Sequence, residues 1–281
     1  MQTQIQILQF LEGLRMEPIT SLMIVITMMA ESTFLSLITM ILYWCVDKEK
    51  SKRLSFMILF SASVNGIVKN IVKFPRPFQV GAVKPIRAHT ATSYSFPSGH
   101  TQAATTFWTS SMLILKKKPV VILGSIIICL TGFSRMYLGV HWPMDVIGGL
   151  LFGIASTFIA AGLIGEDGQF TKWHVIGASM AVIGVLILNV DRDLYKTVAS
   201  IWGVAFGAFL EQKYVKFNPI QSKRIQVVKV LIGTIGVLLL QVGLKKVFPV
   251  YKACDMIRYA LVMLWVTVGA PYCFKAFLKE Q

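Results

Sequence analysis

Long apolar runs, several of them about 20 residues in length, dominate this sequence and restrict the folds that it can adopt. A helix of about 20 apolar residues crosses a hydrocarbon layer of about 30 Å. We therefore predict an all-α fold, a polytopic transmembrane helical bundle of about nine spans, with eight or ten also compatible. The spans are expected near residues 19–45, 54–73, 98–115, 119–138, 143–164, 174–190, 194–213, 225–246 and 256–278.

The segment before the first span, residues 1–16, has apolar residues at helical spacing but is short and polar. Ile5, Leu8 and Leu11 recur at this spacing, with Glu12 and Arg15 among the polar residues between them. Such a segment suits the membrane surface better than the hydrocarbon layer. We therefore expect an N-terminal interfacial helix.

The net charge of +15 would point to a nucleic-acid partner in a soluble protein. Here the basic residues punctuate the spans, so attraction to anionic headgroups and control of topology explain them better. We expect the membrane as a partner and no nucleic acid. None of the four cysteines has the spacing of a metal site, which predicts neither a zinc site nor a disulfide framework.

Short basic loops predict which side of the membrane each helix end faces. Residues 48–53 carry four basic side chains and residues 116–118 carry three, and loops of this kind stay in the cytoplasm. The ends of the second and fourth spans, and the starts of the third and fifth, then face outward. A basic group at residues 245–258 opposes this rule, so the rule does not fix the C-terminal topology. We expect a multi-pass protein of the cell membrane.

The first of three polar patches combines Lys69 and Arg76. A lysine near the end of a span commonly reaches toward the headgroups, so Lys69 alone has an ordinary explanation. Arg76 differs, because Pro75 and Pro77 restrict the backbone on both sides of it. Its planar guanidinium suits the oxygens of a phosphate group. This patch indicates an anion-binding site.

The second patch is Ser95-Phe96-Pro97-Ser98-Gly99-His100, at the start of the third span. A helix start leaves backbone N–H groups unpaired and carries partial positive charge, so it attracts anions. Ser98 can cap the helix, and Gly99 lets an anion approach the backbone closely. Pro-Ser-Gly is also an ordinary way to begin a helix, but such a beginning does not require His100.

The third patch contains Ser134-Arg135, His141 and Asp145. Pro143 suits the first turn of the fifth span, and Asp145 falls within that turn, four residues after His141. The two side chains can therefore meet. A carboxylate that holds one imidazole nitrogen fixes the tautomer and leaves the other nitrogen as a nucleophile or base. A helix-capping role for Asp145 is compatible with this one.

The order and spacing of the three patches resemble the three-part signature of the phosphatidic acid phosphatase type 2 superfamily. The signature is Lys69-x6-Arg76-Pro77, then Pro97-Ser98-Gly99-His100, then Ser134-Arg135-x5-His141-x3-Asp145, and every position is matched. The resemblance covers roughly residues 10–165. We therefore expect a phosphatase-like membrane core at residues 1–165 and a C-terminal transmembrane extension of unassigned role at residues 166–281.

The resemblance implies a metal-independent phosphohydrolase that needs no cofactor. By position, His141 would attack phosphorus to form a phosphohistidine, Asp145 would orient its ring, and His100 would protonate the leaving oxygen and then activate water. The phosphoryl oxygens would be held by the remaining residues of the signature, since phosphoryl transfer depends on positioning and charge. These residues are Lys69, Arg76, Ser98, Gly99 and Arg135.

Several substrates and functions are compatible with these residues. Undecaprenyl diphosphate, phosphatidylglycerol phosphate and phosphatidate all suit a site at the outer interface of a membrane. One alternative is a lipid phosphotransferase, in which an alcohol replaces water at the phosphohistidine. Another is a transporter or scaffold with an inactive core, which the intact His100, His141 and Asp145 disfavour. The sequence leaves the oligomeric state open.

Glu31 is an ionisable residue in the middle of the first expected span, where a charge is costly. We expect it to pair with Asn65 or Lys69 of the second span. Such a pair would steady the candidate site.

Overall fold

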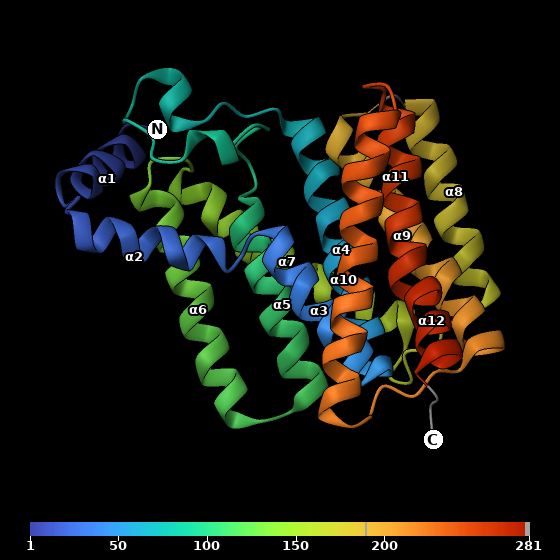
Figure 1. Cartoon of the computed structure of the whole chain (residues 1–281). Coiled ribbons are helices and arrows are strands. Elements are labelled where there is room, and N and C mark those ends of the chain that lie inside the picture. The colour runs from blue at the N-terminus through green and yellow to red at the C-terminus, as the bar shows by residue number, and fades with distance from the viewer. Residues whose placement is uncertain (189, 279–281) are drawn as a thin grey trace. The chain divides into compact units, whose positions relative to one another are not determined.

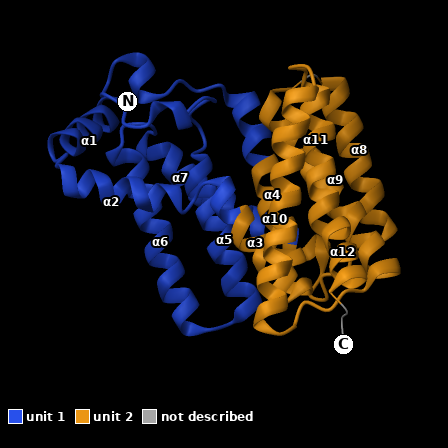
Figure 2. Ribbon diagram, in the orientation of Figure 1, with its two compact units in different colours: residues 1–35, 64–160 blue, residues 36–63, 161–281 orange. Residues whose placement is uncertain are grey.

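The structure, a computed structural model, describes residues 1–188 and 190–278. Every regular element within these residues is a helix, which confirms the predicted all-α class (Figure 1). The chain forms two compact units, coloured separately in Figure 2. Unit 1 consists of Met1–Leu35 and Val64–Ala160, and unit 2 consists of Ser36–Ser63 and Ala161–Gln281. The predicted boundary near residue 165 between core and extension remains a prediction.

Unit 1 contains the helices on which the three polar patches lie. Its elements are α1 (Gln2–Gly13), α2 (Glu17–Met28), the last part of α4 (Lys48–Val72), the 3-10 helices η1 (Pro77–Val80) and η2 (Ala88–Thr90), α5 (Gly99–Leu115), α6 (Lys118–Tyr137) and α7 (Pro143–Ile164). The starts of α5, α6 and α7 agree with the predicted spans to within a residue.

Helices α5 and α7 approach each other closely because two glycines of α7 face α5. A Cβ on Gly149 would lie 2.8 Å from the carbonyl oxygen of Ser98, and one on Gly153 would lie 2.7 Å from Cβ of Thr105. Small residues at such positions allow helices in membranes to pack backbone against backbone. This contact fixes the start of α5 against the start of α7, where two of the polar patches lie.

The N-terminal helix α1 is held by polar contacts at the same end of unit 1. Arg15, just after α1, donates to the carbonyl oxygens of Tyr137 at 3.0 Å and of Lys84 at 2.7 Å. The side-chain oxygen of Gln4 accepts from the backbone N–H of Met144 at 3.1 Å, in the first turn of α7. The predicted helix is confirmed, and its contacts join the ends of α6 and α7 to the loop between α4 and α5.

The first expected span, residues 19–45, is not one continuous helix. Helix α2 ends at Met28 and α3 (Ser32–Cys45) begins after a turn at residues 29–31. Neither glycine nor proline marks this break, and only the three polar residues Glu31, Ser32 and Thr33 interrupt the apolar run there, too few to predict the end of a helix. Glu31 lies in the turn and not in the middle of a helix.

Unit 2 is built from the C-terminal helices together with most of α3 and the first part of α4. Its further elements are α8 (Lys172–Leu188), α9 (Arg192–Leu210), the π-helix η3 (Glu211–Val215), α10 (Lys223–Val247), α11 (Lys252–Leu264), the π-helix η4 (Trp265–Gly269) and α12 (Ala270–Phe277). Helices α9 and α11 pack closely, since a Cβ on Gly203 would lie 2.8 Å from the carbonyl oxygen of Ala260.

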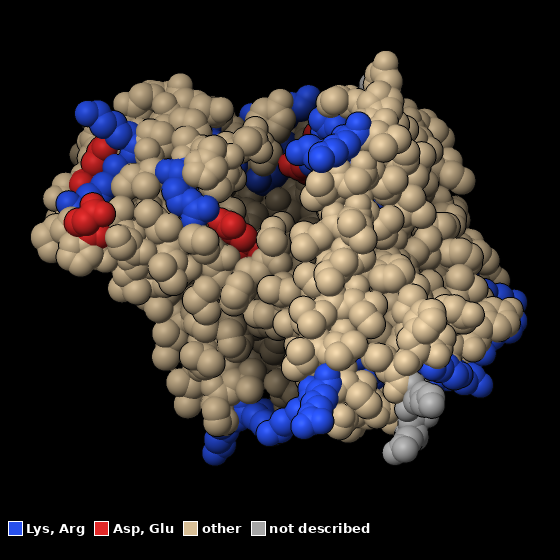
Figure 3. All heavy atoms as spheres, viewed as in Figure 1, with Lys and Arg blue, Asp and Glu red and all other residues tan. Residues whose placement is uncertain are grey.

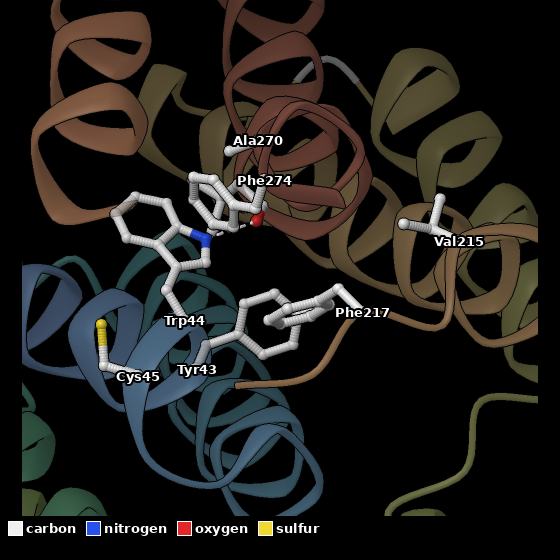
Figure 4. Packing of buried hydrophobic residues seen from close by; sticks show 8 residues of the cluster. Tyr43, Trp44, Cys45, Val215, Phe217, Ala270 and Phe274 are labelled. Atoms are coloured by element: carbon white, nitrogen blue, oxygen red, sulfur yellow. Dashed lines mark hydrogen bonds between the residues drawn. The ribbon is translucent and has the colours of Figure 1, made fainter. Parts of the chain in front are cut away.

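A buried cluster of unit 2 is rich in aromatic residues and includes Tyr43 and Trp44 (Figure 4). The sequence suggests a membrane-interface position for both residues, but both are buried. The Tyr43 hydroxyl donates to the carbonyl oxygen of Thr267 at 2.8 Å, and the Trp44 indole N–H donates to that of Val266 at 2.9 Å. Because η4 supplies these acceptors, the two polar tips are satisfied inside the unit.

The predicted count of nine spans is not confirmed. Among the described residues, five helical segments are long and apolar enough to cross a membrane, and α2 with α3 could form a sixth, broken span. Helix α8 is apolar but has only 17 residues, and α5 has the same length. The five segments are Lys48–Val80, Lys118–Tyr137, Pro143–Ile164, Lys223–Val247 and Lys252–Phe277. On the face shown in Figure 3, lysine and arginine side chains gather in the upper part and along the lower edge.

Candidate active site

His141 lies between a carboxylate and a guanidinium. Its Nδ1 is 3.2 Å from Oδ2 of Asp145, and its Nε2 is 3.1 Å from Nη1 of Arg76. His141 lies in the connection between α6 and α7, and Asp145 lies in the first turn of α7, as predicted. All three side chains are almost completely buried.

These two partners fix the tautomer of the His141 ring. A guanidinium can only donate hydrogen bonds, so Nε2 must be the acceptor in its contact with Arg76. The ring hydrogen is therefore on Nδ1, where it is donated to the carboxylate of Asp145. The arrangement leaves a lone pair on Nε2, which makes this atom the potential nucleophile.

The surroundings of His141 keep its ring neutral. Burial lowers the pKa of this imidazole well below its ordinary value, and the positive charges of Arg76, Arg135 and Lys69 lower it further. A ring that stays neutral retains its lone pair. The same nearby charges favour an anion beside the ring.

Asp145 is held in place by several hydrogen bonds in addition to its contact with His141. Its Oδ2 accepts from the Ser95 hydroxyl at 2.5 Å and from the backbone N–H of Trp142 at 2.8 Å. Its own carbonyl oxygen accepts from the backbone N–H of Ser98 at 2.9 Å. These bonds join the third patch to the second and fix the direction in which the carboxylate faces His141.

The start of α5 has the cap that the sequence predicts. Ser98 is the N-cap, and its hydroxyl accepts from the backbone N–H of Thr101. Gly99 and His100 are the first helical residues, so the geometry of a helix gives their N–H groups no acceptor within it. A Cβ on Gly99 would lie 3.5 Å from Oδ1 of Asn65 and 3.9 Å from Nζ of Lys69. The end of α4 therefore faces the start of α5.

Lys69 and Arg76 meet at Ser93, a residue of the loop between α4 and α5. Lys69 Nζ donates to the Ser93 hydroxyl at 2.9 Å, and Arg76 Nε donates to the Ser93 carbonyl oxygen at 2.7 Å. Arg76 also donates to the carbonyl oxygens of Val140 at 2.9 Å and Tyr94 at 3.3 Å. The loop is thereby tied to His141, and Arg76 uses all three of its guanidinium nitrogens.

Arg135 approaches the site from the last turn of α6 and is almost completely buried. Its Nη1 donates to the Thr27 hydroxyl of α2 at 2.7 Å. Among the described residues, its Nε and Nη2 have no hydrogen-bond partner, and the same is true of Nε2 of His100. Donors that are buried and unpaired suit an anionic ligand.

All eight predicted site residues thus lie at one end of unit 1, at the ends of α4 and α6 and the starts of α5 and α7. The predicted partner of Glu31 is wrong. Its carboxylate accepts from Nη2 of Arg87 at 3.0 Å, and Asn65 instead donates to the Gln102 side chain at 2.8 Å. The cause is the break after α2, which brings Glu31 to the loop that carries Arg87.

Sequence reasoning missed the supporting roles of Thr27, Arg87, Ser93 and Ser95. Ser95 belongs to the second patch, so its place in the motif was a usable signal. Thr27 and Ser93 act through tertiary contacts that no local pattern indicates. Arg87 was visible only as a basic residue in a proline-containing loop.

Two family models match the chain. The model of the PAP2 superfamily matches residues 51–168, which include all eight predicted site residues. The model of the PAP2 superfamily phosphatase transmembrane extension matches residues 195–281. The second match lies within residues 166–281, the C-terminal segment that the sequence analysis left unassigned.

Curated relatives resemble part of the chain. An undecaprenyl-diphosphatase of Sulfolobus acidocaldarius is 30% identical over 116 residues, 40% of this chain and 56% of that protein. An undecaprenyl-diphosphatase of Bacillus subtilis is 37% identical over 99 residues, 34% of this chain and 48% of that protein. The chain therefore spans about half the length of these relatives.

A solved structure shares the fold. The crystal structure of a transmembrane PAP2-type phosphatidylglycerolphosphate phosphatase from Bacillus subtilis matches with a TM-score of 0.51 and 23% identity. The match covers 60% of this chain and 88% of that one.

Proposed function

Because this chain belongs to the PAP2 superfamily, we propose that it is an integral-membrane lipid phosphatase that hydrolyses a phosphate monoester or diphosphate of a lipid. The observation that carries the proposal is the buried row of Asp145, His141 and Arg76. In this row the imidazole of His141 is neutral, and the lone pair on its Nε2 points at the guanidinium of Arg76. Such a ring can attack phosphorus while the cation binds a phosphoryl oxygen.

The first step of the proposed reaction forms a phosphohistidine. His141 Nε2 attacks phosphorus, and an N–P bond forms as the P–O bond to the lipid breaks. Positive charge develops on the ring, where the carboxylate of Asp145 stabilises it. His100 gives a proton to the leaving oxygen.

The second step releases phosphate. His100 takes a proton from water, the water oxygen attacks phosphorus, and the N–P bond breaks, which returns His141 to its neutral form. During both steps the phosphoryl oxygens are bound by Lys69, Arg76 and Arg135 and by N–H groups at the start of α5, next to Ser98 and Gly99. Fixed cations of this kind stabilise charge that shifts during phosphoryl transfer.

We place this site at the outer face of the cell membrane. The site lies at the start of α5, and the basic residues 116–118 lie just after the other end of this helix. A helix of 17 residues is about 25 Å long, close to the thickness of the hydrocarbon layer, so we infer that the candidate site and the basic turn lie toward opposite faces of the membrane. The positive-inside rule assigns the basic turn to the cytoplasm.

Phosphate release in detergent, with EDTA present, tests the proposal. The substrates are undecaprenyl diphosphate, phosphatidylglycerol phosphate, phosphatidate and a soluble sugar phosphate, each with the wild type and with His141→Ala. We expect release from at least one lipid, unaffected by EDTA and abolished by His141→Ala. Wild-type release from none of the lipids, or equal turnover by His141→Ala, would refute the proposed function.

A further inference from the structure

Arg87 is a further cationic side chain beside the candidate site, and the reaction proposed above does not use it. It lies in the loop between α4 and α5 with a left-handed backbone, φ 60° and ψ 40°. Residues with a side chain adopt this conformation rarely, and only where their surroundings hold them in it. The neighbouring Ile86 N–H donates to the carbonyl oxygen of Leu138 at 2.9 Å, which fixes the loop against the end of α6.

Arg87 and Arg135 are held by two neighbouring residues at the end of α2. Arg135 Nη1 donates to the Thr27 hydroxyl at 2.7 Å, and Arg87 Nη2 donates to the Glu31 carboxylate at 3.0 Å. Thr27 and Glu31 are four residues apart, and the hydrogen bond from Glu31 N–H to the Met28 carbonyl oxygen continues the helical turn between them. Side chains at this spacing lie next to each other. Arg87 and Arg135 also interact electrostatically, so the two guanidinium groups lie near each other.

This pair of arginines still has donors to offer after these contacts. Arg135 has Nε and Nη2, and Arg87 has Nη1, buried and without a hydrogen-bond partner among the described residues. Arg76, in contrast, already donates four of its five N–H groups within the protein and has one left for a phosphoryl oxygen. The donors that remain for a ligand are thus concentrated on the side of the site formed by Arg87 and Arg135.

The positive charges around the site exceed the number needed to neutralise a single bound phosphate. Lys69 and Arg76 lie around His141, and a phosphoryl group carries about two negative charges at most. Arg135 of α6 and Arg87 of the loop between α4 and α5 add two further positive charges, and of these two only Arg87 has a carboxylate partner, Glu31. A second phosphate would bring the additional oxygens and charge that this arrangement can bind.

We infer that Arg87, next to Arg135, binds the second phosphate of a lipid diphosphate, the one that leaves with the lipid, while Arg135 binds the terminal phosphate, and that diphosphate esters are the preferred substrates. The inference rests on the proposed function. In the first step the terminal phosphorus forms the bond to His141 Nε2, and its bond to the bridging oxygen breaks. The electron pair of that bond leaves with the lipid monophosphate, whose negative charge Arg87 stabilises. Glu31 is a positioning residue, because it holds Arg87 and does not touch the substrate.

Farnesyl diphosphate and farnesyl monophosphate, which share one lipid chain, test this inference. We would measure kcat/KM for both in detergent with the wild type, Arg87→Gln and Arg87→Lys. Lys84→Gln is the matched control, since Lys84 is an exposed cation of the same loop. The wild type should prefer the diphosphate by about 10-fold or more. Arg87→Gln should lower kcat/KM for the diphosphate by about 10- to 100-fold, as expected for a lost charged hydrogen bond, and that for the monophosphate by less than about 3-fold.

The variants separate the possible outcomes. Arg87→Lys should recover part of the diphosphate activity, and Lys84→Gln should change neither substrate. An equal loss on both substrates in Arg87→Gln, or a wild type without preference, would overturn the inference and leave the proposed function intact. A wild type that hydrolyses neither these two compounds nor the lipids named above would overturn both.

A measurement on the wild type alone covers the case in which Arg87→Gln does not fold. Inorganic pyrophosphate and inorganic phosphate would be compared as competitive inhibitors of the monophosphate reaction. Pyrophosphate should inhibit with a Ki about 10-fold lower or more, because it can reach both groups of cations. Equal inhibition constants would overturn the inference.

Discussion

Asp145→Asn tests whether the charge of Asp145, and not merely its hydrogen bonds, drives the proposed reaction. Asparagine has nearly the same shape, and its oxygen can accept the hydrogen bonds that Ser95 and the Trp142 N–H donate to Asp145. It can also accept from Nδ1 of His141, so the orientation of the ring should be kept. The substitution removes the negative charge, which is most useful when the ring becomes positively charged.

The expected loss follows from the geometry of this pair. His141 Nδ1 and Asp145 Oδ2 are 3.2 Å apart. Two opposite charges about 4 Å apart interact by about 4 kcal/mol at an effective dielectric constant of about 20. Since about 1.4 kcal/mol corresponds to a factor of ten, kcat should fall by about 10³-fold. KM should change little, because the ring is neutral before the reaction.

The assay is steady-state phosphate release in detergent near pH 8, together with thermal unfolding of each variant. Ser95→Ala is the control, because it removes a hydrogen bond to the same carboxylate oxygen and keeps the charge. A lost hydrogen bond of this kind contributes about 1 kcal/mol, so kcat should fall by no more than about 10-fold. A loss in Asp145→Asn that does not exceed that of Ser95→Ala, with both variants folded, would refute the electrostatic role.

Three further predictions concern pH, helix packing and the N-terminal helices. Burial lowers the pKa of His141, so the ring keeps its lone pair as the pH falls. In the pH profile of kcat/KM, the decrease on the acid side that is due to this group should therefore lie below the ordinary histidine pKa of about 6.5. A decrease centred at about 6.5 for several substrates would contradict this. Gly149→Ala should lower the melting temperature and the activity, because its Cβ would lie 2.8 Å from the Ser98 carbonyl oxygen. The expected loss in the free energy of unfolding is about 1–3 kcal/mol. Gly162→Ala on the same helix should be tolerated, and equal effects of the two variants in thermal unfolding would contradict close packing. Thr27→Val should lower kcat/KM by about 10-fold, because Arg135 loses a hydrogen-bond acceptor. Thr20→Val, which affects only a contact with Tyr137, should change kcat/KM by less than about 3-fold. Similar rates for both variants would contradict a role of α2 in the site.

The sequence was sufficient to predict several helices and some local contacts of the candidate site, for physical reasons. Apolar runs and their basic ends determine where helices begin and end, so the bounds of α6 and α7 were predicted closely. The contact between His141 and Asp145 is a local one, four residues apart at the start of a helix, and this spacing alone brings the side chains together. Ser98 as the cap of α5 is likewise a local property.

The remaining features depend on tertiary structure, which local patterns do not encode. The break after α2 occurs in an apolar run without glycine or proline, and only the polar residues Glu31, Ser32 and Thr33 marked it. The pairing of Glu31 with Arg87 requires a loop of more than twenty residues to return to α2. Tryptophan is common at membrane interfaces, but Trp44 is buried against η4, which follows more than two hundred residues later in the chain.

A phosphohistidine at residue 141 is the central claim, and direct detection of it is the most direct test. The purified wild type would be mixed with a lipid substrate that carries a radiolabelled terminal phosphate, quenched within a single turnover and digested. We predict a labelled peptide that contains His141, with a bond that is stable to alkali and labile to acid, and no label in His141→Ala. Full turnover without any labelled enzyme, or label on a residue other than His141, would contradict the proposed mechanism.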